Sequence, residues 1–303
     1  MSHLLAPVWS LLGYRPGQQL VGKHAVVAGG GGIASDLVQL LLDGGLVVHV
    51  IDKNARNLSS LRKRMKLKPT LYTYQVDMTD EAEFESVSNS IKSSALPDHV
   101  SILVHTAAVV NHGSVECLSL KQRRRIFDIN VLTWYSCMRF FLPEMKSSRE
   151  GHIVTFSSVV AYGAGSSASD YCGTKAALLA MHNSLRLELI RDGFSTFIHT
   201  TIIHPYIVDT ELFAKADLKM KWLLPRLTAE HVARATFDGI VYQQETVFVP
   251  RMVLYMCMVA SISPIWFQDI LYKLTGSNQF GIVESNIYKF NFSLCLDTYL
   301  WIL

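Results

Sequence analysis

Residues 24–36 read His-Ala-Val-Val-Ala-Gly-Gly-Gly-Gly-Ile-Ala-Ser-Asp, an apolar strand-like run that leads directly into four glycines and then into a helical pattern. Glycine lets the backbone approach a pyrophosphate closely, and the N–H groups that begin the following helix can bind it. A glycine run alone is also typical of an ordinary loop, but its position between a strand and a helix is what a dinucleotide fold requires. We therefore expect cofactor contacts from Gly29, Gly30, Gly31, Gly32 and Ile33.

The rest of the chain continues the same alternation of strand and helix. Strand-like apolar runs occur at 24–28, 46–52, 71–77, 100–105, 151–158, 195–203 and 246–250. Helical stretches lie between most of them, at 33–43, 54–66, 80–94, 118–145, 170–191 and 228–243. Such alternation is typical of βαβ units. It predicts an α/β protein with a single Rossmann-like, doubly wound domain over residues 20–250, in which helices flank a parallel seven-stranded sheet.

Composition narrows the class of protein further. The chain has 303 residues, half of them hydrophobic, so it can bury a large core. A net charge of +3 is too small to indicate a nucleic-acid partner, and no zinc-binding or nucleic-acid module is present, so we expect neither a metal nor a nucleic acid. The five cysteines are odd in number and widely spaced, which predicts free thiols in a reducing intracellular compartment.

Two apolar stretches are unusual for a soluble enzyme. Residues 1–14 and 252–267 contain no Asp, Glu, Lys or Arg, but both are shorter than a bilayer-spanning helix and each is interrupted by proline. Each stretch is either a core helix or oligomer interface, or a segment that lies in a membrane surface. We therefore treat 1–19 and 251–275 as candidate membrane-contact segments, and we assign no role to the tail 276–303.

Acidic residues follow the second and third predicted strands. Asp52 ends the second strand, where a carboxylate accepts hydrogen bonds from a ribose 2′-hydroxyl and repels a 2′-phosphate. This position favours NAD over NADP, although the nearby Lys53 and Arg56 leave NADP open. Asp77 and Met78, after the third strand, are expected beside the adenine ring. The helix that follows is expected to be capped by Thr79 or Asp80.

Candidate catalytic residues gather around one predicted helix start. Tyr171 and Lys175 are four residues apart, so both can point into one cleft, although a Tyr-x-x-x-Lys match is common by chance. Hydride transfer at a carbonyl carbon needs a group that moves the hydroxyl proton. A tyrosine can do this if a neighbouring cation lowers its pKa from about 10. Ser158, at the end of a predicted strand, is placed to hold the substrate oxygen.

With these motifs in order, residues 20–250 resemble the short-chain dehydrogenase/reductase family. The resemblance rests on the glycine turn, Asp52, Asp77 and the segments 127–131, 156–158, 171–175 and 205–210. It implies that Asn130, Ser158, Tyr171 and Lys175 form a catalytic tetrad, with Asn130 holding a water that links Lys175 to solvent. It also implies cofactor contacts from Ala107, Tyr171, Lys175, Pro205, Val208 and Thr210.

Segments 169–175, 182–189 and 248–251 resemble the branch that holds retinol dehydrogenases and 17β-hydroxysteroid dehydrogenases of lipid droplets and the endoplasmic reticulum. This similarity implies NAD-linked oxidation of a lipophilic primary or secondary alcohol, and the resemblance to the family as a whole implies a homo-oligomer. It also implies an intracellular enzyme on the cytoplasmic face of such a membrane. A substrate lid is expected at about 210–228, with Leu212, Phe213 and Trp222 facing the substrate, although the same pattern is typical of an amphipathic helix that closes the core.

The chain also departs from the family pattern. Ala28 and Ala34 replace the usual threonine and last glycine of the turn, Tyr206 follows Pro205 where glycine is usual, and residues 105–108 read His-Thr-Ala-Ala instead of Asn-Asn-Ala-Gly. We expect these changes to weaken cofactor binding. They keep two alternatives open, an NADPH-dependent carbonyl reductase and a catalytically weak member that binds lipid or a partner at a membrane surface.

Overall fold

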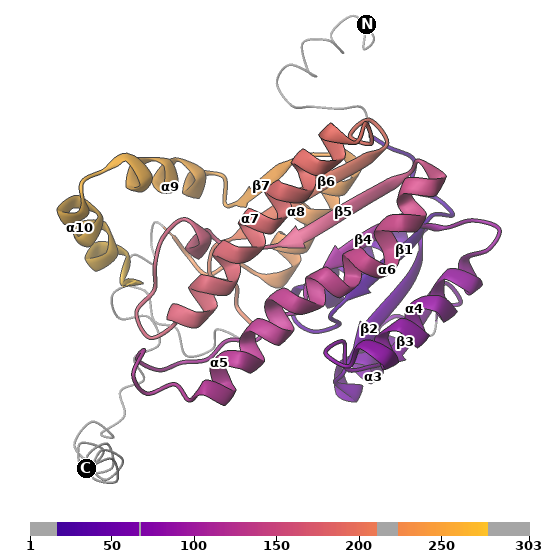
Figure 1. The fold of residues 1–303 in the computed structure, drawn as a ribbon, viewed down its shortest axis with the longest axis horizontal. Coiled ribbons are helices and arrows are strands. Elements are labelled where there is room, and N and C mark those ends of the chain that lie inside the picture. The colour runs from indigo at the N-terminus through magenta and orange to yellow at the C-terminus, as the bar shows by residue number, and fades with distance from the viewer. Residues whose placement is uncertain (1–16, 67, 211–223, 278–303) are drawn as a thin grey trace, which may run out of the picture.

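The computed structural model describes residues 17–66, 68–210 and 224–277. Its centre is a seven-stranded sheet in which every pairing is parallel, in the order β3-β2-β1-β4-β5-β6-β7 (Figure 1). The strands are β1 (His24–Ala28), β2 (Val47–Asp52), β3 (Leu71–Gln75), β4 (Val100–His105), β5 (Gly151–Phe156), β6 (Ile198–Pro205) and β7 (Thr246–Val249). The predicted α/β class and parallel seven-stranded sheet are confirmed.

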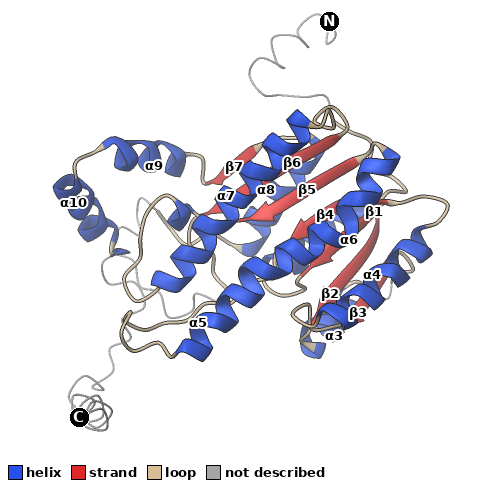
Figure 2. Ribbon diagram, in the orientation of Figure 1, coloured by secondary structure: helices blue, strands red, loops and turns tan. Residues whose placement is uncertain are grey.

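Helices cover both faces of the sheet, as Figure 2 shows. One face is covered by α2 (Ile33–Asp43), α3 (Ala55–Arg64) and α8 (Ala229–Val241), whose apolar residues share a core with one side of the strands. The other face is covered by α4 (Glu81–Ala95), α6 (Thr133–Ser148) and α7 (Ser169–Arg191), which form a second core with the opposite side. Since both faces are covered, the central strands β1 and β4 are fully buried and mostly apolar, whereas the edge strand β3 is partly exposed.

The strand order reverses between β1 and β4, because β2 and β3 lie on one side of β1 while β4 to β7 lie on the other. In open α/β sheets, ligands bind at the carboxyl ends of the strands, next to such a reversal. Ala28 at the end of β1 pairs with Ile51 on one side and with His105 on the other. The glycine turn after β1 and the loop after β4 therefore start side by side.

The stretch expected as one helix over 118–145 is divided. It consists of α5 (Leu120–Phe127), a π-helix η1 (Asp128–Leu132) and α6, which continues to Ser148. A single π-turn inside a helix is often found at functional sites. Here it lies at Asn130, one of the residues in the predicted tetrad.

Two helices follow the sheet, α9 (Met252–Ile262) and α10 (Ile265–Thr275), which project from the side of the domain at the end of β7 (Figure 1). They are separated at Pro264, which precedes the first turn of α10. Among the described residues, no helix is both long enough and apolar enough to cross a membrane. Residues 1–16, the predicted lid residues Leu212, Phe213 and Trp222, and the tail beyond 277 lie outside the described part of the chain.

Candidate active site

The glycine turn is built around a close contact between two strand ends. Gly29 has φ +107°, and a Cβ at this position would lie 2.7 Å from the Thr106 side-chain oxygen and 2.8 Å from the Ala107 nitrogen. Only glycine adopts this conformation and fits this space without strain. Ala107, which was expected to contact the cofactor, is thereby placed directly beside the turn.

The turn then enters α2 through Gly32, which has φ +51°. No side chain caps the start of α2, so the partial positive charge at this helix end faces the turn. A Cβ on Gly32 would lie 3.4 Å from the Thr210 methyl carbon. Thr210, distant in sequence, therefore lies next to the glycine turn. The cradle formed by Gly29 and Gly32 fits the pyrophosphate of a dinucleotide.

Asp52 closes the other side of this turn. Its Oδ2 accepts hydrogen bonds from the Gly30 N–H and the Asn57 side-chain amide, both at 2.8 Å, and its Oδ1 accepts one from the Asn54 N–H at 2.7 Å. A carboxylate offers about four acceptor positions, so these three donors leave one position on Oδ1 for a ribose hydroxyl. Asn57 was not predicted from the sequence, where it reads as one more polar residue of an exposed helix.

Asp77, which was expected beside the adenine ring, also takes part in an ion pair and in hydrogen bonds with Thr79. Its carboxylate pairs with the Lys53 ammonium and accepts hydrogen bonds from the Thr79 N–H at 3.1 Å and the Thr79 hydroxyl at 2.7 Å. Lys53, considered above as a possible attraction for a 2′-phosphate, is thus engaged by Asp77. Met78 is buried in the same apolar cluster as Ala107. The helix cap is Asp80, which accepts a hydrogen bond from an N–H in the first turn of α4 and confirms one of the two predicted caps.

The unusual sequence at the end of β4 has its own bracing. The Thr106 hydroxyl lies 3.0 Å from the carbonyl oxygens of both Ala28 and Gly29, which ties β4 to β1. His105 Nε2 lies 2.9 Å from the Thr133 hydroxyl, whose proton is donated to a backbone carbonyl one turn earlier. His105 must therefore donate through Nε2. Burial lowers the pKa of His105 to about 3, so the ring is neutral at physiological pH.

Ser158, Tyr171 and Lys175 come together at the carboxyl edge of β5, and all three side chains are buried. The Ser158 hydroxyl, which lies 3.4 Å from the Pro205 carbonyl oxygen, also acts on the Tyr171 phenol and opposes part of the effect of burial on its pKa. The Lys175 ammonium donates to the Phe156 carbonyl at 2.9 Å and lies 5.6 Å from the centre of the Tyr171 ring. The strand end supplies the serine, and one turn of α7 supplies both the phenol and the ammonium.

The electrostatics of this cluster are dominated by burial. Burial raises the pKa of the Tyr171 phenol above its ordinary value, while the Ser158 hydroxyl acts in the opposite direction. Burial also lowers the pKa of Lys175 from 10.5 to about 7. We expected Lys175 to lower the pKa of the Tyr171 phenol. In this arrangement the ammonium lies over the ring and donates to a backbone carbonyl, and burial dominates the pKa of the phenol. Strongly shifted pKa values in a buried cluster are typical of functional sites.

Asn130 is completely buried in η1 and connects three elements. Its Oδ1 accepts a hydrogen bond from the Val109 N–H at 2.8 Å. Its amide nitrogen donates to the Val109 carbonyl at 3.0 Å and to the Thr174 hydroxyl at 3.1 Å. Asn130 thus ties the loop after β4 to the helix that carries Tyr171 and Lys175.

The end of β6 forms the remaining wall of the site. The Ser158 hydroxyl lies 3.4 Å from the Pro205 carbonyl oxygen, and Val208 forms an isolated parallel bridge with Leu227. Pro205 and Val208, both predicted to contact the cofactor, are buried beside Ser158 at this strand end. His204, the residue before Pro205, was not predicted from the sequence as a site residue, because a histidine within an apolar strand reads as a core residue.

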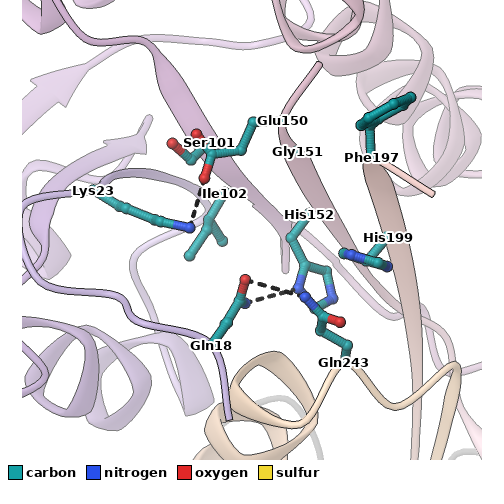
Figure 3. Close-up of a pocket in the computed structure, with 10 residues that line it drawn as sticks. All are labelled: Gln18, Lys23, Ser101, Ile102, Glu150, Gly151, His152, Phe197, His199 and Gln243. Atoms are coloured by element: carbon teal, nitrogen blue, oxygen red, sulfur yellow. Dashed lines mark hydrogen bonds and ion pairs between the residues drawn. The ribbon is translucent and has the colours of Figure 1, made fainter. Parts of the chain in front are cut away.

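A cavity of about 210 Å³, shown in Figure 3, lies at the opposite edge of the sheet, at the amino ends of β4, β5 and β6. Its polar side chains pair with one another. Lys23 contacts Glu150 at 2.6 Å, and the Gln18 amide lies 3.4 Å from His152 Nδ1. None of the predicted catalytic or cofactor residues lines it. Since parallel sheets place their ligands at the carboxyl edge, we do not assign the chemistry to this cavity.

The sheet, the glycine turn and the Ser-Tyr-Lys cluster together define the architecture of a Rossmann-like dehydrogenase. Comparison with known proteins gives the family. A family model described as short chain dehydrogenase matches residues 23–221. The chain belongs to the short chain dehydrogenase family and is an oxidoreductase that acts on CH–OH groups.

Two relatives match the branch that the motifs indicate. Epidermal retinol dehydrogenase 2 of Mus musculus is 26% identical over 254 residues, which cover 83% of this chain and 81% of that protein. Estradiol 17-beta-dehydrogenase 11 of Rattus norvegicus is 27% identical over 230 residues, which cover 76% of this chain and 75% of that protein.

Solved structures agree on the fold. A short chain dehydrogenase from Burkholderia cenocepacia, in complex with NADP, is similar with a TM-score of 0.67 at 20% identity, covering 85% of this chain and 99% of that one. A 3-ketoacyl-(acyl-carrier-protein) reductase from Brucella melitensis, complexed with NADH, gives 0.68 at 20% identity, covering 76% and 97%. One of these two structures holds NADP and the other holds NADH.

Proposed function

We propose that this protein is an NAD(H)-dependent oxidoreductase that interconverts a lipophilic alcohol and its carbonyl compound. The observation that carries the proposal is the buried cluster of Ser158, Tyr171 and Lys175, with the Lys175 ammonium 5.6 Å from the Tyr171 ring, at the same sheet edge as the glycine turn. A bound nicotinamide supplies the hydride acceptor or donor, and the chain must supply proton transfer, orientation and exclusion of water.

The residues divide these tasks. Ser158 holds the substrate oxygen, and the Tyr171 hydroxyl takes the proton from the alcohol or returns it to the carbonyl oxygen. Lys175, whose pKa lies near 7, exchanges its proton readily at physiological pH and orients the phenol. The amide of Asn130 is engaged by Val109 and Thr174, so we place the water relay at the main-chain carbonyl of Asn130.

Cofactor choice follows from Asp52. A carboxylate with one open acceptor position suits a ribose hydroxyl, and its negative charge repels a 2′-phosphate. Lys53 is paired with Asp77, which reduces its value as a phosphate partner. The second candidate, an NADPH-dependent carbonyl reductase, keeps the same catalytic residues.

Titration with NADH and with NADPH distinguishes the three candidate functions. Quenching of tryptophan fluorescence reports the binding of each cofactor. We expect NADH to bind at least about tenfold more tightly, a difference of about 1.4 kcal/mol. Preference for NADPH would favour the reductase. Binding of neither would favour the catalytically weak member, in spite of the bracing that His105 and Thr106 provide.

A lipophilic substrate is supported by the relatives' names and by the exposed apolar side chains of α10, among them Trp266 and Ile270, since this helix borders the loop that leads to Tyr171. The loop 163–166, which leads towards Tyr171, is covered by α10. A Cβ on Gly163 would lie 3.4 Å from the Tyr272 hydroxyl, and the Ser166 N–H donates to the Ser277 carbonyl at 3.0 Å. Turnover of retinol and estradiol should therefore exceed that of a short-chain secondary alcohol such as 2-propanol. Preference for 2-propanol would contradict a lipid substrate.

We further propose that α9 and α10 lie in a membrane surface. Helix α9 carries no charged side chain and buries only Val253 against the domain. A helix that is apolar on all sides is normally buried in a core or in lipid. Large apolar side chains of this pair are exposed, including Tyr255, Met258, Ile262, Ile265, Trp266 and Ile270.

Co-flotation with phosphatidylcholine vesicles tests this surface. The double variant Ile262→Glu, Trp266→Glu should lose flotation, whereas Val21→Glu, an equally exposed apolar position outside α9 and α10, should retain it. Flotation of both variants would contradict the proposal. The expected endoplasmic reticulum or lipid-droplet location and the cytoplasmic face depend on this surface, and expression of a fluorescent fusion would test both.

We also propose a homo-oligomer. The support is that α6 and α7 expose apolar side chains away from the core, including Tyr135, Leu187 and Ile190. Light scattering after size-exclusion chromatography in detergent should give a multiple of the chain mass of 34.0 kDa. A monomeric mass at micromolar concentration would contradict this proposal.

A further inference from the structure

His204 lies beneath the catalytic serine, at the end of β6. The ring is fully buried, its Nδ1 lies 3.3 Å from the main-chain oxygen of Ser158, and its Nε2 lies 3.5 Å from the Tyr162 hydroxyl. Burial lowers the pKa of His204 to about 4, and the nearby Lys175 ammonium contributes in the same direction. The ring is therefore neutral in the physiological pH range.

The partners of His204 define which nitrogen carries the proton. A carbonyl oxygen can only accept, so Nδ1 must donate to Ser158. In a neutral imidazole the other nitrogen is then an acceptor, and Tyr162 donates to it. This tautomer makes His204 a directed donor towards the strand end that carries the catalytic hydroxyl.

Packing holds the ring in this orientation. Phe248 stacks on one side, with ring centres 4.6 Å apart and planes at 29°, and Tyr162 meets the ring edge at 5.0 Å. Ser158 is thus held by β6 at two points, through its main-chain oxygen at His204 and through its hydroxyl at Pro205. Without the donor at His204, the turn that begins at Ser158 has one fewer restraint beside the reacting atoms.

We propose that His204 is a positioning residue for the hydride-transfer reaction, which fixes the Ser158 hydroxyl relative to Tyr171 through the Nδ1–H bond to the Ser158 carbonyl. This inference rests on the proposed function, because it assumes that Ser158 and Tyr171 act on the substrate. It differs from a purely structural role in predicting that the turnover number falls while cofactor binding is kept.

Three variants test the proposal. His204→Leu removes the donor, whereas His204→Asn places an amide near the position of Nδ1 and can restore the bond to the Ser158 carbonyl. His182→Leu is the matched control, since His182 is also a buried imidazole but bonds to the Thr155 hydroxyl at 3.0 Å. We expect kcat to fall about 10- to 100-fold in His204→Leu, because displacement by about 1 Å costs up to that factor.

In His204→Asn, kcat should recover to within about threefold of wild type, and His182→Leu should also remain within about threefold. The KM for NADH and the quenching by NADH should be unchanged in all three, which shows that each is folded. If His204→Leu fails to fold, the comparison of His204→Asn with His182→Leu still tests whether His204 positions Ser158. A tenfold loss of kcat in His204→Asn would overturn the proposal.

Full turnover in His204→Leu, or an equal loss in His182→Leu, would also overturn the positioning role. An inactive wild-type enzyme on every alcohol and ketone would instead overturn the proposed function. The two failures are therefore distinguishable.

Discussion

Replacing Lys175 by methionine should stabilise the protein while it abolishes turnover. The ammonium is buried, its hydrogen bond goes to the Phe156 carbonyl, and burial lowers its pKa from 10.5 to about 7. At pH 7, that difference corresponds to a cost of about 4 kcal/mol in the free energy of unfolding. Methionine removes this cost but leaves the Phe156 carbonyl without its donor, a loss of about 1–2 kcal/mol. We expect a net gain of about 2–3 kcal/mol.

The difference in stability between the wild type and Lys175→Met should change with pH in a defined direction. Between pH 7 and 10 the unfolded chain keeps the Lys175 proton while the folded protein has released it. The unfolding free energy of the wild type should therefore rise with pH, relative to the variant, by about 1.4 kcal/mol per pH unit. The cost of burying the Lys175 amine should disappear as the pH approaches 10. The remaining difference in stability between the wild type and the methionine variant is then the hydrogen bond to the Phe156 carbonyl.

Urea unfolding of both proteins at pH of about 7, 8 and 9 provides the measurement, with the slope against urea concentration as a check on two-state behaviour. Parallel stability curves would rule out the cost of burial, since they would mean that the buried amine titrates as it does in the unfolded chain. A variant less stable than the wild type at pH 7 would do so as well.

Three further changes have defined outcomes. Asp52→Ser should reduce the preference for NADH over NADPH about tenfold in a fluorescence titration, and an unchanged ratio would show that the carboxylate does not select the cofactor. Gly29→Ala should cost about 1–3 kcal/mol in denaturant unfolding, more than Gly193→Ala, because both have positive φ but only Gly29 lies against other atoms. Burial lowers the pKa of His105 and His182 to about 3 from 6.5, so their neutral forms stabilise the fold above pH 6.5 and this stability is lost as the pH falls. The two rings together should cost about 3 kcal/mol between pH 6.5 and 5, and a melting temperature that stays constant over this range would contradict their burial as neutral groups.

Sequence patterning predicts this fold well because its signals are local. Each strand is a short apolar run bounded by polar residues, and each helix has its own period. The errors occur where a local pattern does not specify the backbone. The helix expected over 118–145 contains a π-turn at Asn130, whose bonds to Val109 and Thr174 join parts of the chain that are distant in sequence.

Some residues of the candidate site can be predicted from the sequence and others cannot, for the same reason. Gly29, Ser158 and Tyr171 are found because a glycine turn, a strand end and a helix face are local features. His204 and Asn57 are not found, because their roles depend on contacts across the sheet and the glycine turn.

Residues 105–108 at the end of β4, which differ from the family pattern, also show what the sequence alone does not predict. The sequence indicates the loss of a bracing asparagine at His105. Only the three-dimensional arrangement shows that His105 bonds to the Thr133 hydroxyl and that Thr106 bonds to β1. The side chains that replace the usual asparagines are thus anchored by contacts that cannot be recognised along the chain.

The proposed mechanism depends on proton transfer by Tyr171 during hydride transfer. Its most direct test is the turnover of a lipophilic alcohol with NAD by the Tyr171→Phe variant, with NADH binding measured on the same preparation. Loss of the hydroxyl should lower kcat by at least about 100-fold, the lower end of what a positioned general acid–base group contributes, while the affinity for NADH stays within about threefold. A Tyr171→Phe variant that binds NADH and turns over at the wild-type rate would show that the phenol does not move the proton.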